Sequence, residues 1–422
     1  MQGTITGNIS YCFSFSTYKE SGGSATVREK AIRSSIKKRY PTAVFDDDPG
    51  SDKQSLLRDL RIGTEFLHGK GLPFPCFRVV LPNYKLEMDG FDVFDSCVYM
   101  SIFPESDSAH IFICISVKDG SPDDFVYLRH VQGNGRKLKN IDGREISVME
   151  IFNEVSASLR QPIGEIEDTY LLEIKKFGEY EDVQAALDKD MNLVYGIVCG
   201  DEGWRNVPVS LAGERMNYQW GSRDFIRLVT FGANSVFFNL NESGKAKEYL
   251  ENRKKFDDEY YDGNVNPYFL IDSNTAGVNH GILFSLEMVL VIKTICSRVI
   301  NRQAQFYANN SGLLSRDIQR IKAYRGELIV ILNKVENLQI SEVRELERVL
   351  LRSYDIEPVI EKIKYLLEIL ESELELLYQT STNRLINLLT IAGLVLAAIQ
   401  VLQGLFGRQS LQLHFRPHSS AM

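Results

Sequence analysis

Residues 385–407 read LINLLTIAGLVLAAIQVLQGLFG, a stretch with no ionisable side chain. Leu, Ile, Val or Phe occupies 13 of its positions. A helix needs about 20 predominantly apolar residues to cross roughly 30 Å of hydrocarbon. Each of these side chains favours insertion by roughly 0.3–0.6 kcal/mol, and Asn387, Gln400 and Gln403 offset only part of that gain. The stretch therefore predicts one transmembrane helix. The alternative is a buried helix of a soluble core.

One face of this helix carries small and hydrogen-bonding residues at alternating steps of three and four positions. We call this face the polar stripe. It consists of Asn387, Thr390, Gly393, Ala397, Gln400, Gly404 and Gly407. Such residues let transmembrane helices approach closely and bond across the contact. The stripe predicts self-association, either as a simple packing face or as the lining of a narrow, neutral, polar pore in an oligomer.

The region before the span is almost wholly helical in its periodicity. Helices are predicted at residues 282–305, 313–335, 341–354 and 358–406. The last begins at Pro358, which suits a first helical turn, and it would extend over about 70 Å at 1.5 Å per residue. Its first half has an apolar face opposite a charged face, which predicts a coiled-coil stalk packed on partner helices. The apolar run 281–295 is interrupted by Glu287 and Lys293, which favours a core helix with one charged edge over a re-entrant or membrane-surface segment.

The first part of the chain alternates strand-like and helix-like segments. Strands are predicted at 4–16, 91–103, 110–117, 125–130, 170–175, 193–198, 225–231, 235–240 and 268–271. Helices are predicted at 27–39, 55–67, 148–159, 181–187 and 245–255. We therefore expect an α+β protein with four parts. They are a mixed α/β sensor or regulatory domain at 1–276, a helical stalk at 277–384, the transmembrane helix at 385–407 and a short tail at 408–422.

Composition narrows the function class and the location. The net charge of −8 argues against a nucleic-acid-binding protein, since such proteins gather Lys and Arg on one face. The six cysteines form no CxxC pair, which suggests neither a zinc site nor a disulfide framework and fits a reducing cytosol. Residues 1–16 lack the features of a secretory signal. The expected location is the cell inner membrane, single-pass, with the large N-terminal domain in the cytoplasm.

No established catalytic motif is present, so the chain is not expected to be an enzyme and no cofactor is expected. The sequence contains neither GxxxxGK[ST] nor GxSxG nor HExxH. The acidic run 46–48 could bind a divalent cation, but Pro49 and Gly50 beside it favour a turn. A second loop, expected to follow a strand and to expose its tryptophan, is a possible ligand site, although a purely structural loop is the favoured interpretation. It contains Asp201, Glu202, Trp204 and Arg205.

The C-terminal region resembles the CorA-like metal-ion transporter superfamily. The likeness covers roughly residues 313–409 and is carried by TNRLINLLTI at 382–391 and by GLFG at 404–407. It implies a homo-oligomer, usually a pentamer, in which the polar stripe surrounds a cation path. Two features depart from the family pattern. Arg408 and Gln409 follow Gly407 where a Gly-Met-Asn signature would continue, and residues 408–422 are too short for a second transmembrane helix.

Three functional hypotheses follow. The first is a CorA-like cation channel, or a degenerate relative, gated by its cytoplasmic domain. The second is a membrane-anchored sensor or effector, of the kind used in bacterial defence, that tethers to or perturbs the bilayer without selective transport. The third is a soluble helical scaffold or an enzyme without a recognisable site.

Overall fold

The computed structural model of the chain describes residues 3–17, 25–48, 56–61, 76–82, 84–88, 90–104, 107–129, 138–140, 142–159, 166–216, 218–260, 274–275, 278–308, 329 and 341–412. The chain divides into two compact units. The first, which we call the sheet domain, comprises Met1–Ala308 and Val330–Glu361. The second, the helical unit, comprises Asn309–Ile329 and Lys362–Met422.

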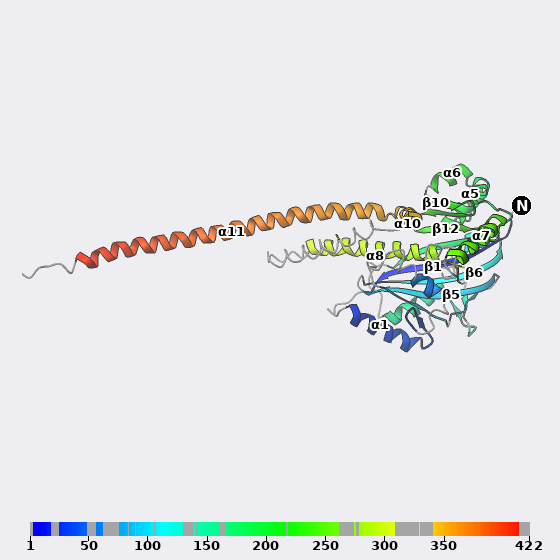
Figure 1. Cartoon of the computed structure of the whole chain (residues 1–422), viewed down its shortest axis with the longest axis horizontal. Coiled ribbons are helices and arrows are strands. Elements are labelled where there is room, and N and C mark those ends of the chain that lie inside the picture. The colour runs from blue at the N-terminus through cyan, green and yellow to red at the C-terminus, as the bar shows by residue number, and fades with distance from the viewer. Residues whose placement is uncertain are drawn as a thin grey trace, which may run out of the picture. The chain divides into compact units, whose positions relative to one another are not determined.

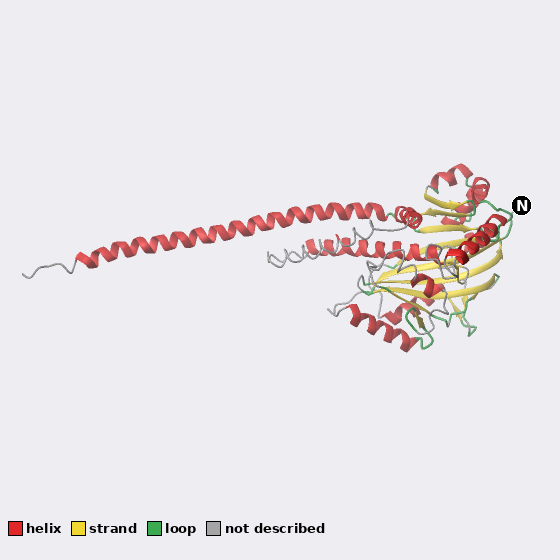
Figure 2. Cartoon of the chain, in the orientation of Figure 1, coloured by secondary structure: helices red, strands yellow, loops and turns green. Residues whose placement is uncertain are grey.

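A nine-stranded mixed sheet forms the centre of the sheet domain (Figures 1 and 2). In spatial order its strands are β10 (Tyr218–Arg223), β11 (Ile226–Phe231), β12 (Asn234–Asn239), β9 (Glu167–Phe177), β1 (Ile5–Ser16), β6 (Ser108–Gly120), β5 (Asp92–Phe103), β3 (Phe77–Val80) and β2 (Val44–Phe45). Neighbouring strands are antiparallel except for β12 and β9, which are parallel. The predicted α+β class with a mixed α/β N-terminal part is confirmed at this level.

Two small sheets accompany the main one. The first contains β4 (Glu87–Met88), β7 (Leu138–Lys139) and β8 (Glu145–Ile146). The second contains β13 (Asn274–Thr275) and β14 (Val278–Asn279).

Strand β1 lies in the middle of the main sheet, and its sequence ITGNISYCFSFS explains its two different faces. Successive side chains of a strand point to opposite faces. The odd-numbered positions therefore place Ile9, Tyr11 and Phe13 on one face, while the even-numbered positions place Ser10 and Ser14 on the other. Both faces are buried along almost the whole strand. Helices must therefore cover the sheet on both sides.

The odd-numbered face packs on α3 (Pro122–Leu128), α4 (Val148–Ser156) and α5 (Val183–Cys199). This face is apolar and aromatic. The ring centroids of Phe13 and Phe152 lie 4.7 Å apart, and the Tyr11 hydroxyl donates to the Leu128 carbonyl at 2.7 Å. Burial of large aromatic side chains dominates core energetics, so this side anchors the sheet.

The even-numbered face packs on α8 (His280–Ala308), and α10 (Ser341–Ser353) contacts both α8 and the β10 end of the sheet. Residues 282–292 of α8 are all buried. The sheet domain therefore includes two helices that the sequence boundary at 276/277 assigned to the stalk. For α8, periodicity could not reveal this difference, because a helix buried on all sides lacks the polar face that marks a surface helix.

Further helices are α1 (Ala25–Arg39), α6 (Val209–Arg215), α7 (Gly244–Tyr260) and α11 (Ile356–Gln412), and residues 56–61 are also helical. Short 3₁₀ turns occur at Ala157–Leu159 and Trp204–Asn206. A tight corner at Asp355, whose φ is +54°, separates α10 from α11. The predicted start at Pro358 is within two residues of the observed one.

Two strand predictions are wrong. Residues 125–130 were expected to form a strand, but Ser121 and Asp124 form a reciprocal capping box around Pro122 and start helix α3. Residues 193–198 were expected to form a strand and instead complete α5, which Gly200 ends with φ of +66°. In both segments local capping outweighed a β-like composition. The predicted strand 268–271 and almost all of the predicted helix 313–335 lie outside the described residues.

Candidate functional site

The most unusual surface in the described chain is the apolar part of α11. Tyr378–Val401 is long and apolar enough to span a membrane, with a mean hydropathy of 1.9, and none of it is buried. Leu388 and Leu394 are 69% and 66% exposed. A large contiguous apolar surface indicates a partner or a membrane. A buried core helix, the alternative considered from sequence, would hide these side chains within its own chain.

The polar stripe lies on this helix. The described side chains of Asn387, Thr390, Ala397 and Gln400 are exposed. The Thr390 hydroxyl donates to the Ile386 carbonyl at 2.8 Å, which leaves its methyl group at the surface. A Cβ added at Gly393 would meet no atom within 4 Å, so this chain by itself does not require glycine there. Gly404 and Gly407 belong to the same helix by their backbone.

Helix α11 is longer than the predicted 358–406 segment. Its 57 residues correspond to about 85 Å at 1.5 Å per residue. Near its start Ile360 and Ile363 are buried, whereas Tyr365 and Leu376 are exposed. The apolar face predicted for the first half of this helix includes Leu366, Leu370, Leu374 and Leu377, whose side chains lie outside the described set.

The predicted ligand loop follows helix α5, not a strand, and its tryptophan is buried. Trp204 is only 4% exposed because its side chain packs against α5 at Gly196, where an added Cβ would come within 2.5 Å of the Trp204 Cβ. Asp123 accepts from the Trp204 indole N–H at 3.1 Å and from Arg205 at 2.8 and 2.6 Å. The expectation of an exposed tryptophan is wrong.

The two carboxylates of this loop have different surroundings. Asp201 accepts from the Gly203 amide at 2.8 Å, and Glu202 is exposed. Arg205 lies over the Trp204 ring, 4.4 Å from its centroid. Of the four residues predicted as a ligand site, Trp204 and Arg205 are thus held by the α3 carboxylate of Asp123.

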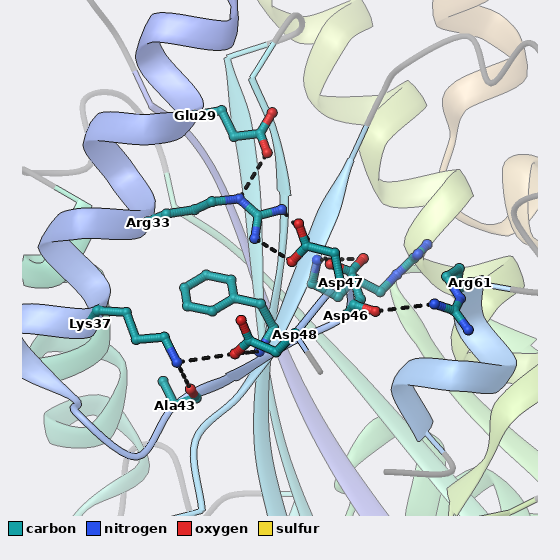
Figure 3. Close-up of polar contacts among 10 residues, drawn as sticks. Glu29, Arg33, Lys37, Ala43, Asp46, Asp47, Asp48 and Arg61 are labelled. Atoms are coloured by element: carbon teal, nitrogen blue, oxygen red, sulfur yellow. Dashed lines mark hydrogen bonds and ion pairs between the residues drawn. The ribbon is translucent and has the colours of Figure 1, made fainter. Parts of the chain in front are cut away.

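The acidic run 46–48 forms a turn whose charges are matched by cations of α1 (Figure 3). Arg33 Nη1 lies 2.7 Å from Asp47 Oδ1, and Lys37 Nζ lies 3.0 Å from Asp48 Oδ2. Burial raises the pKa of Asp46, against the opposing effect of Arg78. These ion pairs explain the acidic run as structural. No group of three potential metal-ligating side chains occurs among the residues that the structure describes.

Sequence reasoning missed a buried ion pair between the sheet and α8. Arg78 Nε donates to both carboxylate oxygens of Glu287 at 3.0 Å, and Nη2 donates to Oε2. The side chains are 1% and 0% exposed. Glu287 was recognised as an interruption of an apolar helix. Nothing in the strand sequence FRVV identified its partner.

A second buried carboxylate holds the start of α8. Glu173 Oε2 accepts from the backbone N–H of Asn279 at 2.6 Å, and Oε1 accepts from Asn239 Nδ2 at 3.1 Å. Asn279 in turn caps α8, because its Oδ1 accepts from the Ile282 amide at 3.0 Å. Burial raises the pKa of Glu173 to about 7, although Lys175 and these two hydrogen bonds act to lower it.

This raised pKa predicts a pH-dependent stability. Between about pH 4.5 and pH 7 Glu173 should remain protonated in the folded protein, whereas in the unfolded chain it ionises near its ordinary pKa of 4.5. Its contribution to the free energy of unfolding is therefore fully present below about pH 4.5 and is lost as pH rises through 7, by roughly 3 kcal/mol. Urea unfolding at pH 5 and pH 8 measures it. In Glu173→Gln the loss between these pH values should shrink by that amount, and an unchanged loss would contradict the assignment.

The described geometry thus combines an exposed apolar helix with a sheet domain that contains charged groups at a buried interface. Comparison of the chain with protein-family models, with curated proteins and with solved structures finds no match.

Proposed function

We propose that this chain is a single-pass membrane protein in which copies of α11 associate through the polar stripe and enclose a narrow cation path gated by the sheet domain. The observation that carries the proposal is the complete exposure of Tyr378–Val401 in the chain itself. A bilayer removes the apolar surface of residues 385–401 from water at no cost in charge burial, since these residues contain no ionisable group.

Self-association is supported by the composition of the stripe. In lipid, exposed amides such as those of Asn387 and Gln400 favour hydrogen bonds to a neighbouring helix. Gly393 and Ala397 leave space for that neighbour. In an oligomer that turns this face inward, the pore has a neutral, polar lining. The resemblance to CorA-like transporters implies the same arrangement. The sheet domain and the stalk lie on the cytoplasmic side in this proposal.

Ion flux into liposomes tests the pore. The full chain is reconstituted, and cation flux is recorded for wild type, Gln400→Leu and the neighbouring control Ile399→Leu. We expect flux from the wild type and from Ile399→Leu, and a loss of about tenfold or more in Gln400→Leu, because a leucine replaces a polar lining group with an apolar constriction. Absence of flux from the wild type, or flux indifferent to Gln400→Leu, would overturn the channel.

A second candidate is a membrane-anchored sensor or effector without selective transport. One observation favours it: the described residues contain a single candidate span. In the same liposomes, an effector that perturbs the bilayer should release both small ions and an encapsulated dye. A protein that only tethers to the membrane should bind fully and release neither. Indifference of either result to Gln400→Leu would select this candidate over the channel.

A further inference from the structure

We infer that α8 is a releasable helix, which detaches from the sheet as a unit while the rest of the sheet domain stays folded. A regulatory role for this release rests on the proposed function. The connection is covalent: α8 ends at Ala308, and the helical unit begins at Asn309. Release of α8 would alter the chain directly at the entry to the unit that carries the membrane segment.

The sheet surface beneath α8 is unusually polar. One register-matched row crosses five adjacent strands, and we call it the polar row. It consists of Arg78, Ser101, His110, Ser14 and Glu167. Helix α8 forms ion pairs with both ends of the row, through Glu287 to Arg78 and through Lys293 to Glu167 at 2.8 Å. Charged contacts therefore hold α8 at both ends of a row that crosses five of the nine strands.

The middle of the row is incompletely satisfied. His110 Nδ1 lies 2.9 Å from Ser14 Oγ, but His110 Nε2 and Ser101 Oγ are buried with no hydrogen-bond partner among the described residues. Ser285 Oγ, on α8 itself, is also buried with no hydrogen-bond partner among the described residues. Buried polar atoms are normally paired, and an unpaired one favours the state in which water reaches it. Detachment of α8 hydrates these atoms.

The opposite face of the sheet is held by aromatic packing that does not involve α8, so the release stays local. There, Tyr11, Phe13 and Phe152 form an aromatic core. The Tyr11 hydroxyl is paired, and the Tyr170 hydroxyl beside it is buried without a hydrogen-bond partner among the described residues. Each strand beneath α8 also keeps its backbone hydrogen bonds to neighbouring strands when the helix leaves. Local opening with a lower free energy than global unfolding is expected for an element docked in this way.

Buried thiols on both sides of the interface report the opening. Cys296 lies on α8 and is 1% exposed, while Cys12 and Cys114 lie on the even-numbered face of β1 and β6 and are 0% and 1% exposed. Trp204 and Trp220 are the only tryptophans of the chain, and both are buried in the sheet domain, so their fluorescence reports its global unfolding.

The experiment measures maleimide labelling of each cysteine by mass spectrometry in the full chain, held in detergent micelles without denaturant. We expect Cys296 and Cys12 to label together, at least about tenfold faster than the unfolding rate given by tryptophan fluorescence. Glu287→Gln should accelerate both cysteines by about tenfold or more, because Arg78 loses its counter-charge. Phe152→Leu, on the opposite face, should speed global unfolding without accelerating labelling beyond it.

Labelling of Cys296 and Cys12 only at the global unfolding rate, in wild type and in Glu287→Gln, would overturn the inference. Labelling needs no bilayer and no ion flux. A protein that releases α8 but conducts nothing would therefore refute the channel alone, and a conducting protein with a fixed α8 would refute the releasable helix alone.

Discussion

A chain truncated after Thr382 is expected to leave the membrane fraction completely, whereas the full chain should resist carbonate extraction. The truncation keeps the sheet domain and the first part of α11 but removes nearly all of the apolar span. Insertion of the span is favoured by several kcal/mol, which corresponds to a large change in partitioning. Fractionation of cells that express each chain, followed by detection in pellet and supernatant, measures it.

Point substitutions in the full-length chain distinguish the loss of the apolar span from a general effect of shortening the chain. Leu388→Arg combined with Leu394→Arg places two charges near the centre of the span, each at a cost of about 2.5–3.5 kcal/mol. This variant should extract with carbonate. Tyr365→Arg, at an exposed position of the same helix outside the span, should behave as wild type. A full chain that is soluble in carbonate, or a double variant that stays in the pellet, would contradict membrane insertion.

Removal of Glu287 alone should destabilise the sheet domain by about 3–5 kcal/mol, because the buried guanidinium of Arg78 loses the carboxylate to which it is hydrogen-bonded. Glu287→Leu tests this loss. Replacement of both residues, Arg78→Met with Glu287→Leu, should restore most of the stability, since a well-packed apolar pair can match a buried ion pair. Urea unfolding of the full chain in micelles, followed by fluorescence of Trp204 and Trp220, provides the free energies.

The double-mutant cycle makes this prediction specific. The coupling energy between the two sites should amount to several kcal/mol, and Lys293→Met should show almost no coupling to Arg78→Met because its partner is Glu167. A double variant as unstable as the sum of the two single variants would show that the pair does not act as a unit.

The strands at the centre of the sheet were predictable from local pattern. Segments 4–16 and 91–103 match β1 and β5 closely, and segment 170–175 lies within the longer β9. Apolar residues alternate or run continuously there over lengths typical of strands. The segments 125–130 and 193–198 also contain β-branched or aromatic residues, yet they are helical. Their neighbours supply N-caps at Ser121 and Asp182, and a capped start decided the outcome where composition was ambiguous.

The candidate sites also differ in how far the sequence alone could predict them. The polar stripe follows from helical spacing alone, so every residue of it was named from the sequence. The loop at 201–205 was named from the sequence as a set, but the burial of Trp204 depends on Gly196 of α5 and on Asp123 of α3. Those partners come from other elements, and a linear pattern contains no information about them.

The sequence by itself determined the apolar span and its polar face, because both are properties of one helix and need only its period of 3.6 residues. It also determined that the N-terminal part mixes helices with strands. Only the tertiary structure decided that α8 belongs to the sheet domain and that Arg78 meets Glu287, 209 residues further along the chain. Sheet register and helix packing bring such residues together, and buried charges then pair because an isolated charge in a low-dielectric interior is too costly.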